Sequence, residues 1–144
     1  MRTMLFVTIV GLAAIGCSKS DSKKADTSQG SPLVEEKVPE VTVDQVDTAL
    51  ASSEWQAVDA NGEGTRKKMG ILPGAVLLTD YETFTPSELP ADKAKGLVFY
   101  CANTACGASH EAASRARTAG YKNVKVMPEG IAGWVKAGKK VQTI

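Results

Sequence analysis

Hydrophobic and polar positions divide the chain into three parts. An apolar run extends from Met4 to Ile15. Residues 18–40 are rich in Ser, Lys, Asp and Glu and hold almost nothing to bury, so they cannot offset the entropy lost on ordering the chain. From Val41 to Ile144 short apolar runs alternate with amphipathic stretches, and this pattern predicts one compact domain with a modest core.

The periodicity within this domain predicts four helical segments. They cover about residues 41–50, 86–89, 110–119 and 131–137. Thr42 or Asp44 is expected to cap the first of them, because both side chains accept hydrogen bonds from a first-turn amide. The alanine-rich segment 110–119 presents one flat face, and Gly120 just past its end predicts a C-terminal cap. In the last helix, Trp134 is expected to supply core area.

Short apolar runs between these helices predict four strands. They cover about residues 55–58, 75–78, 97–100 and 123–127, whereas the glycine-rich, basic stretch 61–70 predicts an irregular loop. Alternating strands and helices favour the α/β class, with a mostly parallel central sheet flanked by helices. Ligands of such domains bind at the carboxyl ends of the strands. Cys101 follows the strand at 97–100 directly, so it is expected at such an end.

Charge argues against one class of partner. The chain has 17 basic and 16 acidic residues with both signs interspersed, so it carries no basic stripe that would favour nucleic acid. We expect a monomer.

The N-terminus is typical of an export signal. Arg2 precedes an apolar stretch of about a dozen residues, which is short of the roughly 20 needed to span a bilayer. The segment Ala14-Ile15-Gly16-Cys17 resembles a bacterial lipobox, which implies cleavage before Cys17 and its lipidation. Ordinary secretion and an uncleaved anchor are the alternatives.

These features give an expected domain organisation. Residues 1–16 are a signal peptide, 17–40 are the lipidated cysteine with a flexible tether, and 41–144 are the folded domain. Ser18 after the cysteine resembles lipoproteins sorted to the outer membrane, so we expect a protein of the bacterial cell envelope, bound by its lipid to the periplasmic face of that membrane. A disulfide between Cys101 and Cys106 is chemically allowed there.

The stretch after Cys101 has the composition of an anion-binding loop. A nucleophilic cysteine works as the thiolate, yet an ordinary thiol with a pKa of about 8.5 is only a few per cent ionised at neutral pH. Small residues before a helix let backbone amides and the helix dipole converge on one sulfur. Ser109 is expected to cap that helix and to share its hydroxyl with the bound group, and His110 to add positive charge or lie exposed. The expected loop comprises Ala102, Asn103, Thr104, Ala105, Cys106, Gly107 and Ala108.

Several segments in order resemble the rhodanese homology domain, from about Val41 to the C-terminus. They are Val58-Asp59, ILPGA at 71–75, VFYC at 98–101, GYKNV at 120–124 and GIAGW at 130–134. The resemblance implies that Cys101 is a nucleophile that takes sulfane sulfur as a persulfide. The donor would be thiosulfate or a persulfide and the acceptor a thiol or cyanide, with no cofactor.

The sequence also departs from that family. Asn61 and Gly70 stand where many members have an arginine and a histidine, and the loop after Cys101 is about two residues longer and uncharged. A longer loop resembles the branch related to dual-specificity phosphatases, but the nearest arginine, Arg115, lies inside the following helix, which disfavours phosphate recognition. Two alternatives therefore stay open: a non-catalytic binding or sensing module, and a thiol-disulfide redox protein using Cys101 and Cys106.

Other candidate residues have competing interpretations. Cys106 is a small loop residue, a partner that resolves a Cys101 persulfide, or a metal ligand with Cys101 and His110. Structural zinc sites take four ligands and the chain has a single histidine, so we expect no metal. Asp59 either caps the loop that follows its strand or orients the active loop. The basic run 66–68 either attracts anionic donors or is a solvated surface.

Overall fold

The computed structural model describes residues 36–144. The expected signal peptide, Cys17 and most of the expected tether lie outside this range. No helix within it is both long enough and apolar enough to cross a membrane.

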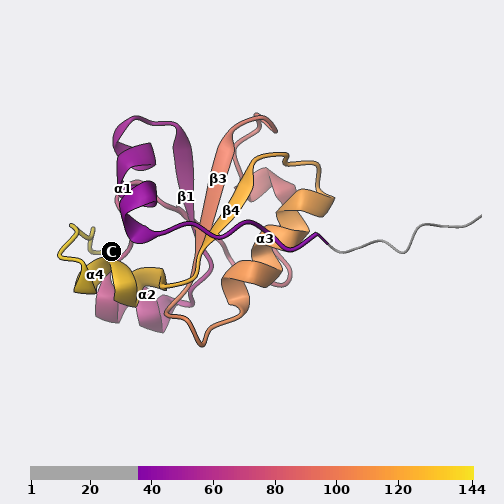
Figure 1. Ribbon diagram of the computed structural model, residues 1–144. Helices are drawn as coiled ribbons and strands as arrows, with labels where there is room; N and C mark the ends of the chain where they lie inside the picture. The colour runs from indigo at the N-terminus through magenta and orange to yellow at the C-terminus, as the bar shows by residue number, and fades with distance from the viewer. Residues whose placement is uncertain (1–35) are drawn as a thin grey trace, which may run out of the picture. The chain divides into compact units, whose positions relative to one another are not determined.

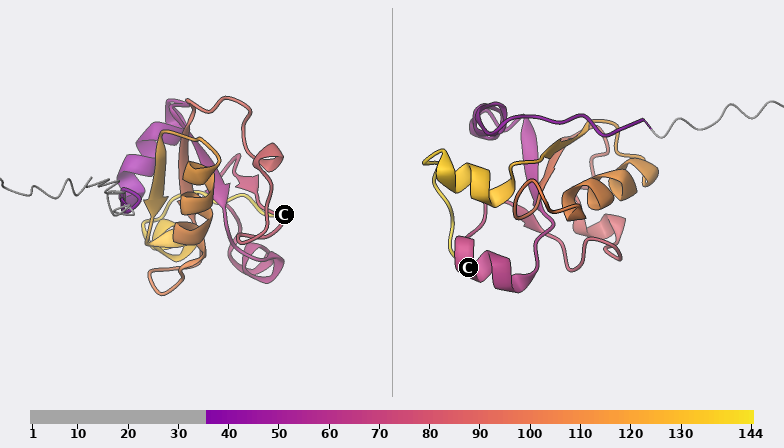
Figure 2. Two further views of the ribbon diagram at one scale, coloured as in Figure 1. Left: turned by 90° about the vertical axis from the view of Figure 1, so that its right-hand side faces the viewer. Right: turned by 60° about the horizontal axis from the view of Figure 1, so that its bottom comes forward.

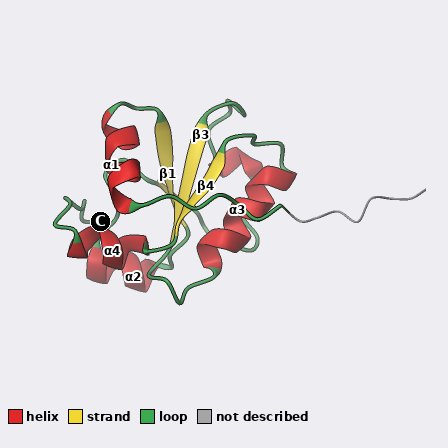
Figure 3. Ribbon diagram, viewed as in Figure 1, coloured by secondary structure: helices red, strands yellow, loops and turns green. Residues whose placement is uncertain are grey.

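A four-stranded parallel sheet forms the centre of the domain, in the order β2-β1-β3-β4 (Figures 1 and 3). Its strands are β1 (Trp55–Asp59), β2 (Val76–Leu77), β3 (Gly96–Tyr100) and β4 (Val124–Met127). The predicted α/β class with a mostly parallel sheet is confirmed. Strand β2 is shorter than the predicted 75–78, because the carbonyl of Leu78 accepts a hydrogen bond from Arg66 at 2.9 Å and leaves the ladder.

Strand β3 lies inside the sheet, and all five of its residues are buried. Side chains alternate between the two faces of a strand. Val98 and Tyr100 therefore pack in one cluster with residues of α1 (Val43–Ala51) and α4 (Gly130–Lys136). The right-hand view of Figure 2 shows these two helices on one side of the strands. Phe99 and Cys101 pack in the other cluster, against α3 (Ala108–Thr118). Alternation thus aims the Cys101 side chain at α3.

Helix ends follow the expected capping chemistry at two places. Thr42 caps α1, and its side chain and that of Gln45 each bond the other's backbone amide. After α3, Gly120 adopts a φ of +96°, and the amide of Tyr121 returns to the carbonyl of Ala116 at 3.2 Å. The short helical segment predicted at 86–89 is a 3-10 helix, η1 (Pro86–Glu88).

The expected irregular loop at 61–70 is wrong, because this stretch contains a helix, α2 (Glu63–Met69). Gly62 begins it, Glu63 lies in its first turn and Lys67 pairs with Glu63 at 2.5 Å. The glycines of this stretch argue against a helix. Burial of Arg66 nevertheless stabilises it, because the guanidinium donates to the Asp59 carboxylate at 3.3 Å. A tertiary contact therefore overrides the weak local preference.

Asp59 joins the ends of β1 and β3 in a buried network. Its carboxylate accepts hydrogen bonds from the amide of Asn61 at 2.7 Å and from the hydroxyl of Tyr100 at 2.6 Å. The Tyr100 oxygen in turn accepts from the amide of Leu72 at 3.0 Å. Burial, followed by the nearby carboxylate, raises the pKa of Tyr100, so this hydroxyl stays a donor.

Packing begins upstream of the expected boundary at Val41. Val38 is buried, the amide of Val126 donates to Pro39 at 2.9 Å, and the amide of Val41 donates to Val126 at 2.8 Å. Glu40 forms a parallel bridge with Val126. Residues 38–41 therefore cover the outer edge of β4.

We expect Arg66→Met to lower the free energy of unfolding by about 3 kcal/mol, because it leaves the buried Asp59 carboxylate without its cation. Lys67→Met is the matched control on the same helix. Its ion pair is exposed and is worth about 0.5 kcal/mol or less. Urea unfolding measures both, and equal losses would contradict the role given to the buried pair.

Candidate functional site

The candidate site lies where β3 ends and α3 begins. Cys101 follows β3 directly and is only 1 % exposed. Asn103 closes a turn in the next residues: its side chain accepts from the amide of Ala105 at 3.0 Å and its carbonyl from the amide of Cys106 at 3.0 Å. This turn returns the chain to Cys101, so two cysteines five residues apart meet at one helix N-terminus.

Helix α4 holds the start of this loop. The amide of Ile131 donates to the carbonyl of Cys101 at 2.8 Å, and that of Ala132 donates to the carbonyl of Ala102 at 3.0 Å. Amides in the first turn of a helix have no partner within the helix, so the loop backbone acts as their cap. These bonds fix the two peptide groups that follow the Cys101 Cα.

Gly130 permits this close approach. A Cβ at this position would lie 2.5 Å from the carbonyl oxygen of Cys101 and 2.7 Å from the carbonyl carbon of Ala102. Its φ of +61° is also in the left-handed region that side chains disfavour. In the sequence this glycine begins the GIAGW segment at 130–134, and that segment gave no indication of its contact with Cys101.

The Cys101 sulfur faces more acceptors than donors. It lies 3.1 Å from the carbonyl oxygen of Cys106 and 4.0 Å from that of Asn103, with the Ser109 hydroxyl at 3.3 Å. Burial, followed by its hydrogen bond to the Cys106 sulfur, raises the pKa of Cys101, although the hydroxyl and amide of Ser109 oppose this. The geometry therefore favours a protonated Cys101 thiol.

The Cys106 sulfur has the opposite surroundings. It is half-buried, and the Cys101 thiol and the amides of Ala102 and Ala108 lie near enough to lower its pKa. Burial raises the pKa of Cys106, but these three donors outweigh it and the net direction is downward. The loop amides expected around Cys101 thus lie in part around Cys106, and the one amide that faces Cys101 is that of Ser109.

Ser109 lies beside Cys101 but does not cap α3. The N-cap is Gly107, which has no side chain to accept a first-turn amide, and Ser109 is already within the first turn. Its side chain is buried and in contact with the Cys101 sulfur. The expected capping role is therefore wrong, while the structure places the hydroxyl next to the sulfur.

His110 interacts with Glu40 rather than with either cysteine sulfur. Its Nε2 is 3.5 Å from a carboxylate oxygen of Glu40, and its side chain is partly exposed. Within residues 36–144 no group of three His, Cys, Asp or Glu side chains is arranged to hold a metal ion. Both described cysteines are free thiols.

The polar contacts of Asp59 and of Arg66, the first residue of the basic run 66–68, lie outside the cysteine loop. Asp59 caps the amide of Asn61, as one interpretation expected, and it reaches the site only through Tyr100, the residue before Cys101. Lys67 and Lys68 are exposed, but the expectation of a wholly exposed basic run is wrong for Arg66, which is buried on Asp59.

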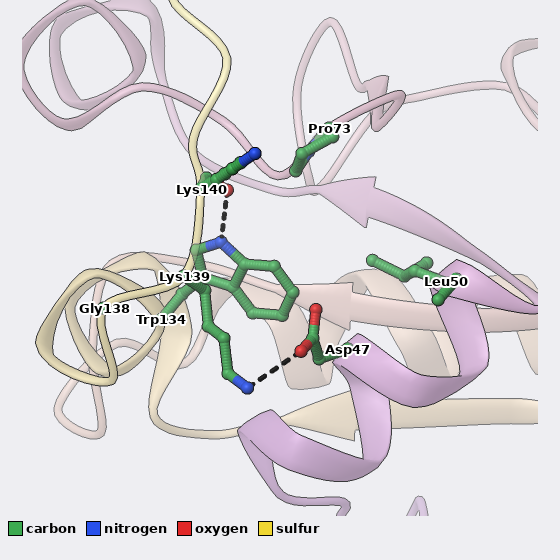
Figure 4. Close-up of a pocket in the computed structure, with 8 residues that line it drawn as sticks. Asp47, Leu50, Pro73, Trp134, Gly138, Lys139 and Lys140 are labelled. Atoms are coloured by element: carbon green, nitrogen blue, oxygen red, sulfur yellow. Dashed lines mark hydrogen bonds and ion pairs between the residues drawn. The ribbon is translucent and has the colours of Figure 1, made fainter.

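A hollow of about 470 Å³ lies between α1, α4 and the chain after α4 (Figure 4). Trp134 donates its indole N–H to the carbonyl of Lys140 at 2.7 Å there, and Lys139 pairs with Asp47 at 2.8 Å. The indole N–H of Trp134, the ammonium of Lys139 and the carboxylate of Asp47 therefore have partners within the protein. It is lined by Asp47, Leu50, Ala51, Pro73, Trp134, Gly138, Lys139 and Lys140, none of which belongs to the cysteine loop.

Comparison with known proteins identifies one family. The sequence model of the Rhodanese-like domain matches residues 42–137, which include both cysteines and α4. No curated protein sequence matches the chain.

Solved structures show the same fold. The human single-domain sulfurtransferase TSTD1 superposes with a TM-score of 0.55 at 19% identity over 69% of this chain and 96% of that one. The 3-mercaptopyruvate sulfotransferase SseA from Escherichia coli gives 0.60 and 21%, over 74% of this chain and 51% of that one. A possible tyrosine phosphatase from Rhodopseudomonas palustris gives 0.61 and 23%, over 73% and 85%. At these identities the likeness shows the fold alone.

We expect Gly130→Ala to lower the free energy of unfolding by about 3 kcal/mol, because the methyl group adds a backbone overlap to left-handed strain. Gly138→Ala is the matched control, because its φ of +71° carries the same strain while nothing lies within 4 Å of the added Cβ. It should cost about 1 kcal/mol. Urea unfolding compares the two, and a loss at Gly130 no larger than at Gly138 would contradict the close approach.

Proposed function

The chain belongs to the rhodanese-like domain family, and on this premise we propose that it is a sulfurtransferase or sulfane-sulfur carrier that forms a persulfide on Cys101. The observation that carries the proposal is the position of this sulfur. It lies at the N-terminus of α3, within reach of the Ser109 amide, the Ser109 hydroxyl and a second sulfur. A helix N-terminus favours an anion, and a persulfide is one.

The proposed chemistry needs only a donor and an acceptor. A cysteine thiolate attacks the outer sulfur of thiosulfate, the sulfur-sulfur bond breaks, and its electron pair leaves with sulfite. An acceptor thiolate or cyanide then attacks the terminal sulfur of the persulfide, and the cysteine leaves as thiolate. Cys106, in contact with Cys101, would take part in this release.

Two structural neighbours support the same class of reaction by name, TSTD1 as a sulfurtransferase and SseA as a 3-mercaptopyruvate sulfotransferase. The uncharged loop weakens the alternative of phosphate chemistry. Arg115, the arginine nearest to it in sequence, donates to the carbonyl of Phe84 at 3.1 Å.

Thiol-disulfide exchange is the second candidate, and the contact between the two free thiols favours it. Oxidation would join the two sulfurs and release two protons and two electrons to a disulfide of a partner, which becomes a dithiol. A Cys101–Cys106 bond that forms reversibly near the potential of the compartment would support this function, and two persistently free thiols would count against it.

For sulfur transfer, we expect the wild-type protein to gain the mass of one sulfur atom after thiosulfate treatment, with fragmentation locating that atom on Cys101. Cys101→Ser should lower thiocyanate formation from cyanide at least about a hundredfold, because the delivering persulfide cannot form. Ser114→Ala, in the middle of α3, is the control and should keep wild-type rates. A wild type that gains no sulfur, or a Cys101→Ser variant with full turnover, would refute the proposal.

We also propose that the domain is held in the bacterial cell envelope, on the periplasmic face of the outer membrane, by lipid on Cys17. The support is the sequence before and after this cysteine. Cys17→Ser should lose incorporation of labelled fatty acid and leave the membrane fraction, whereas Cys101→Ser should keep both. Lipid incorporation that survives Cys17→Ser would exclude this anchor.

A further inference from the structure

The two sulfurs of the site differ in access to solvent. Cys101 is 1 % exposed and lies between β3 and α3, while Cys106 is half-buried on the loop outside it. Residues 103–105, between the cysteines, are exposed, so the outer side of the loop faces solvent. A donor from solution therefore meets the Cys106 sulfur before it can meet that of Cys101.

The backbone groups near the two sulfurs also differ in the sign of their partial charges. A carbonyl oxygen 3.1 Å from the Cys101 sulfur would repel a negative charge on that atom, although the charge of a persulfide is on its outer sulfur; the amide of Ser109 lies near the Cys101 sulfur. The Cys106 sulfur instead lies near the amides of Ala102 and Ala108, which lower its pKa, and Ala108 is the first residue of α3. Backbone amides near a sulfur favour its thiolate form. Access and charge thus select the same sulfur.

We propose that Cys106 is the residue that takes sulfane sulfur from the donor and then passes it inward to Cys101. This inference rests on the proposed sulfur transfer and assigns the attacking role in its first step. Cys101 keeps the delivering persulfide, and Cys106 becomes the entry point rather than only a partner in release.

The two steps balance within the pair. The Cys106 thiolate attacks the outer sulfur of thiosulfate, and the electron pair of the broken sulfur-sulfur bond leaves with sulfite. The Cys101 sulfur then attacks the terminal sulfur of the Cys106 persulfide, whose sulfur-sulfur bond breaks with its electron pair on Cys106. The Cys101 proton, which the thiol donates to the carbonyl oxygen of Cys106 at 3.1 Å before the transfer, moves to the Cys106 sulfur. One persulfide replaces another, so this transfer needs no external oxidant or reductant.

Alkylation of the wild-type protein tests which sulfur reacts first. We expect iodoacetamide at neutral pH to modify Cys106 at least about tenfold faster than Cys101, because reactivity follows thiolate content and access. Peptide fragmentation assigns the modified residue at each time point. Equal rates, or a faster reaction at Cys101, would overturn the proposal without any substitution that could disturb folding.

Loading with thiosulfate tests the transfer itself. Cys106→Ser should gain sulfur on Cys101 at least about tenfold more slowly than the wild type, because the donor must reach a buried sulfur. Cys101→Ser should load at close to the wild-type rate and hold the sulfur on Cys106, and Ser114→Ala should behave as wild type. Loading of Cys106→Ser at the wild-type rate would overturn the entry role alone. A wild type that does not load would overturn the proposed function and this inference with it, whatever the alkylation order.

Discussion

The docking of α4 on the loop after β3 is the constraint on which the site depends. The amides of Ile131 and Ala132 are capped by the carbonyls of Cys101 and Ala102, and the bare Cα of Gly130 lets the two segments meet. The loop therefore cannot shift while α4 stays packed through its buried Trp134. The Cys101 sulfur is positioned here by backbone contacts from the face of the sheet opposite to α3.

A single helix N-terminus then serves two sulfurs. Ala108 and Ser109 are the first two residues of α3, and the amide of each lowers the pKa of a different cysteine, Cys106 and Cys101 respectively. Two thiolates in contact would repel each other, so when the pair loses its first proton, the carbonyls beside Cys101 keep the remaining proton on the buried sulfur. The division of the pair into one donor and one acceptor follows from the backbone of the loop rather than from any nearby cationic side chain.

The buried hydrogen-bond network of Asp59, Arg66 and Tyr100 holds the end of β3, which leads directly into the cysteine loop. It joins the ends of β1 and β3 and draws α2 against the carbonyl of Leu78. Arg66 reaches Asp59 from one helical turn into α2, while Asn61, two residues after the aspartate, offers it only a backbone amide. Because Tyr100 precedes Cys101, the network fixes the last strand residue before the site.

The sequence by itself determined the fold class, the strands, most of the helices and the position of Cys101, because alternation and capping are local properties of the chain. Thr42 and Gly120 were assigned correctly for this reason. Only the tertiary structure decided that residues 63–69 form a helix, that Gly107 rather than Ser109 begins α3, and that Gly130 contacts the loop. It also decided which sulfur faces amides and which faces carbonyls. These features depend on atoms brought together from distant segments, and no periodicity along the chain records their distances.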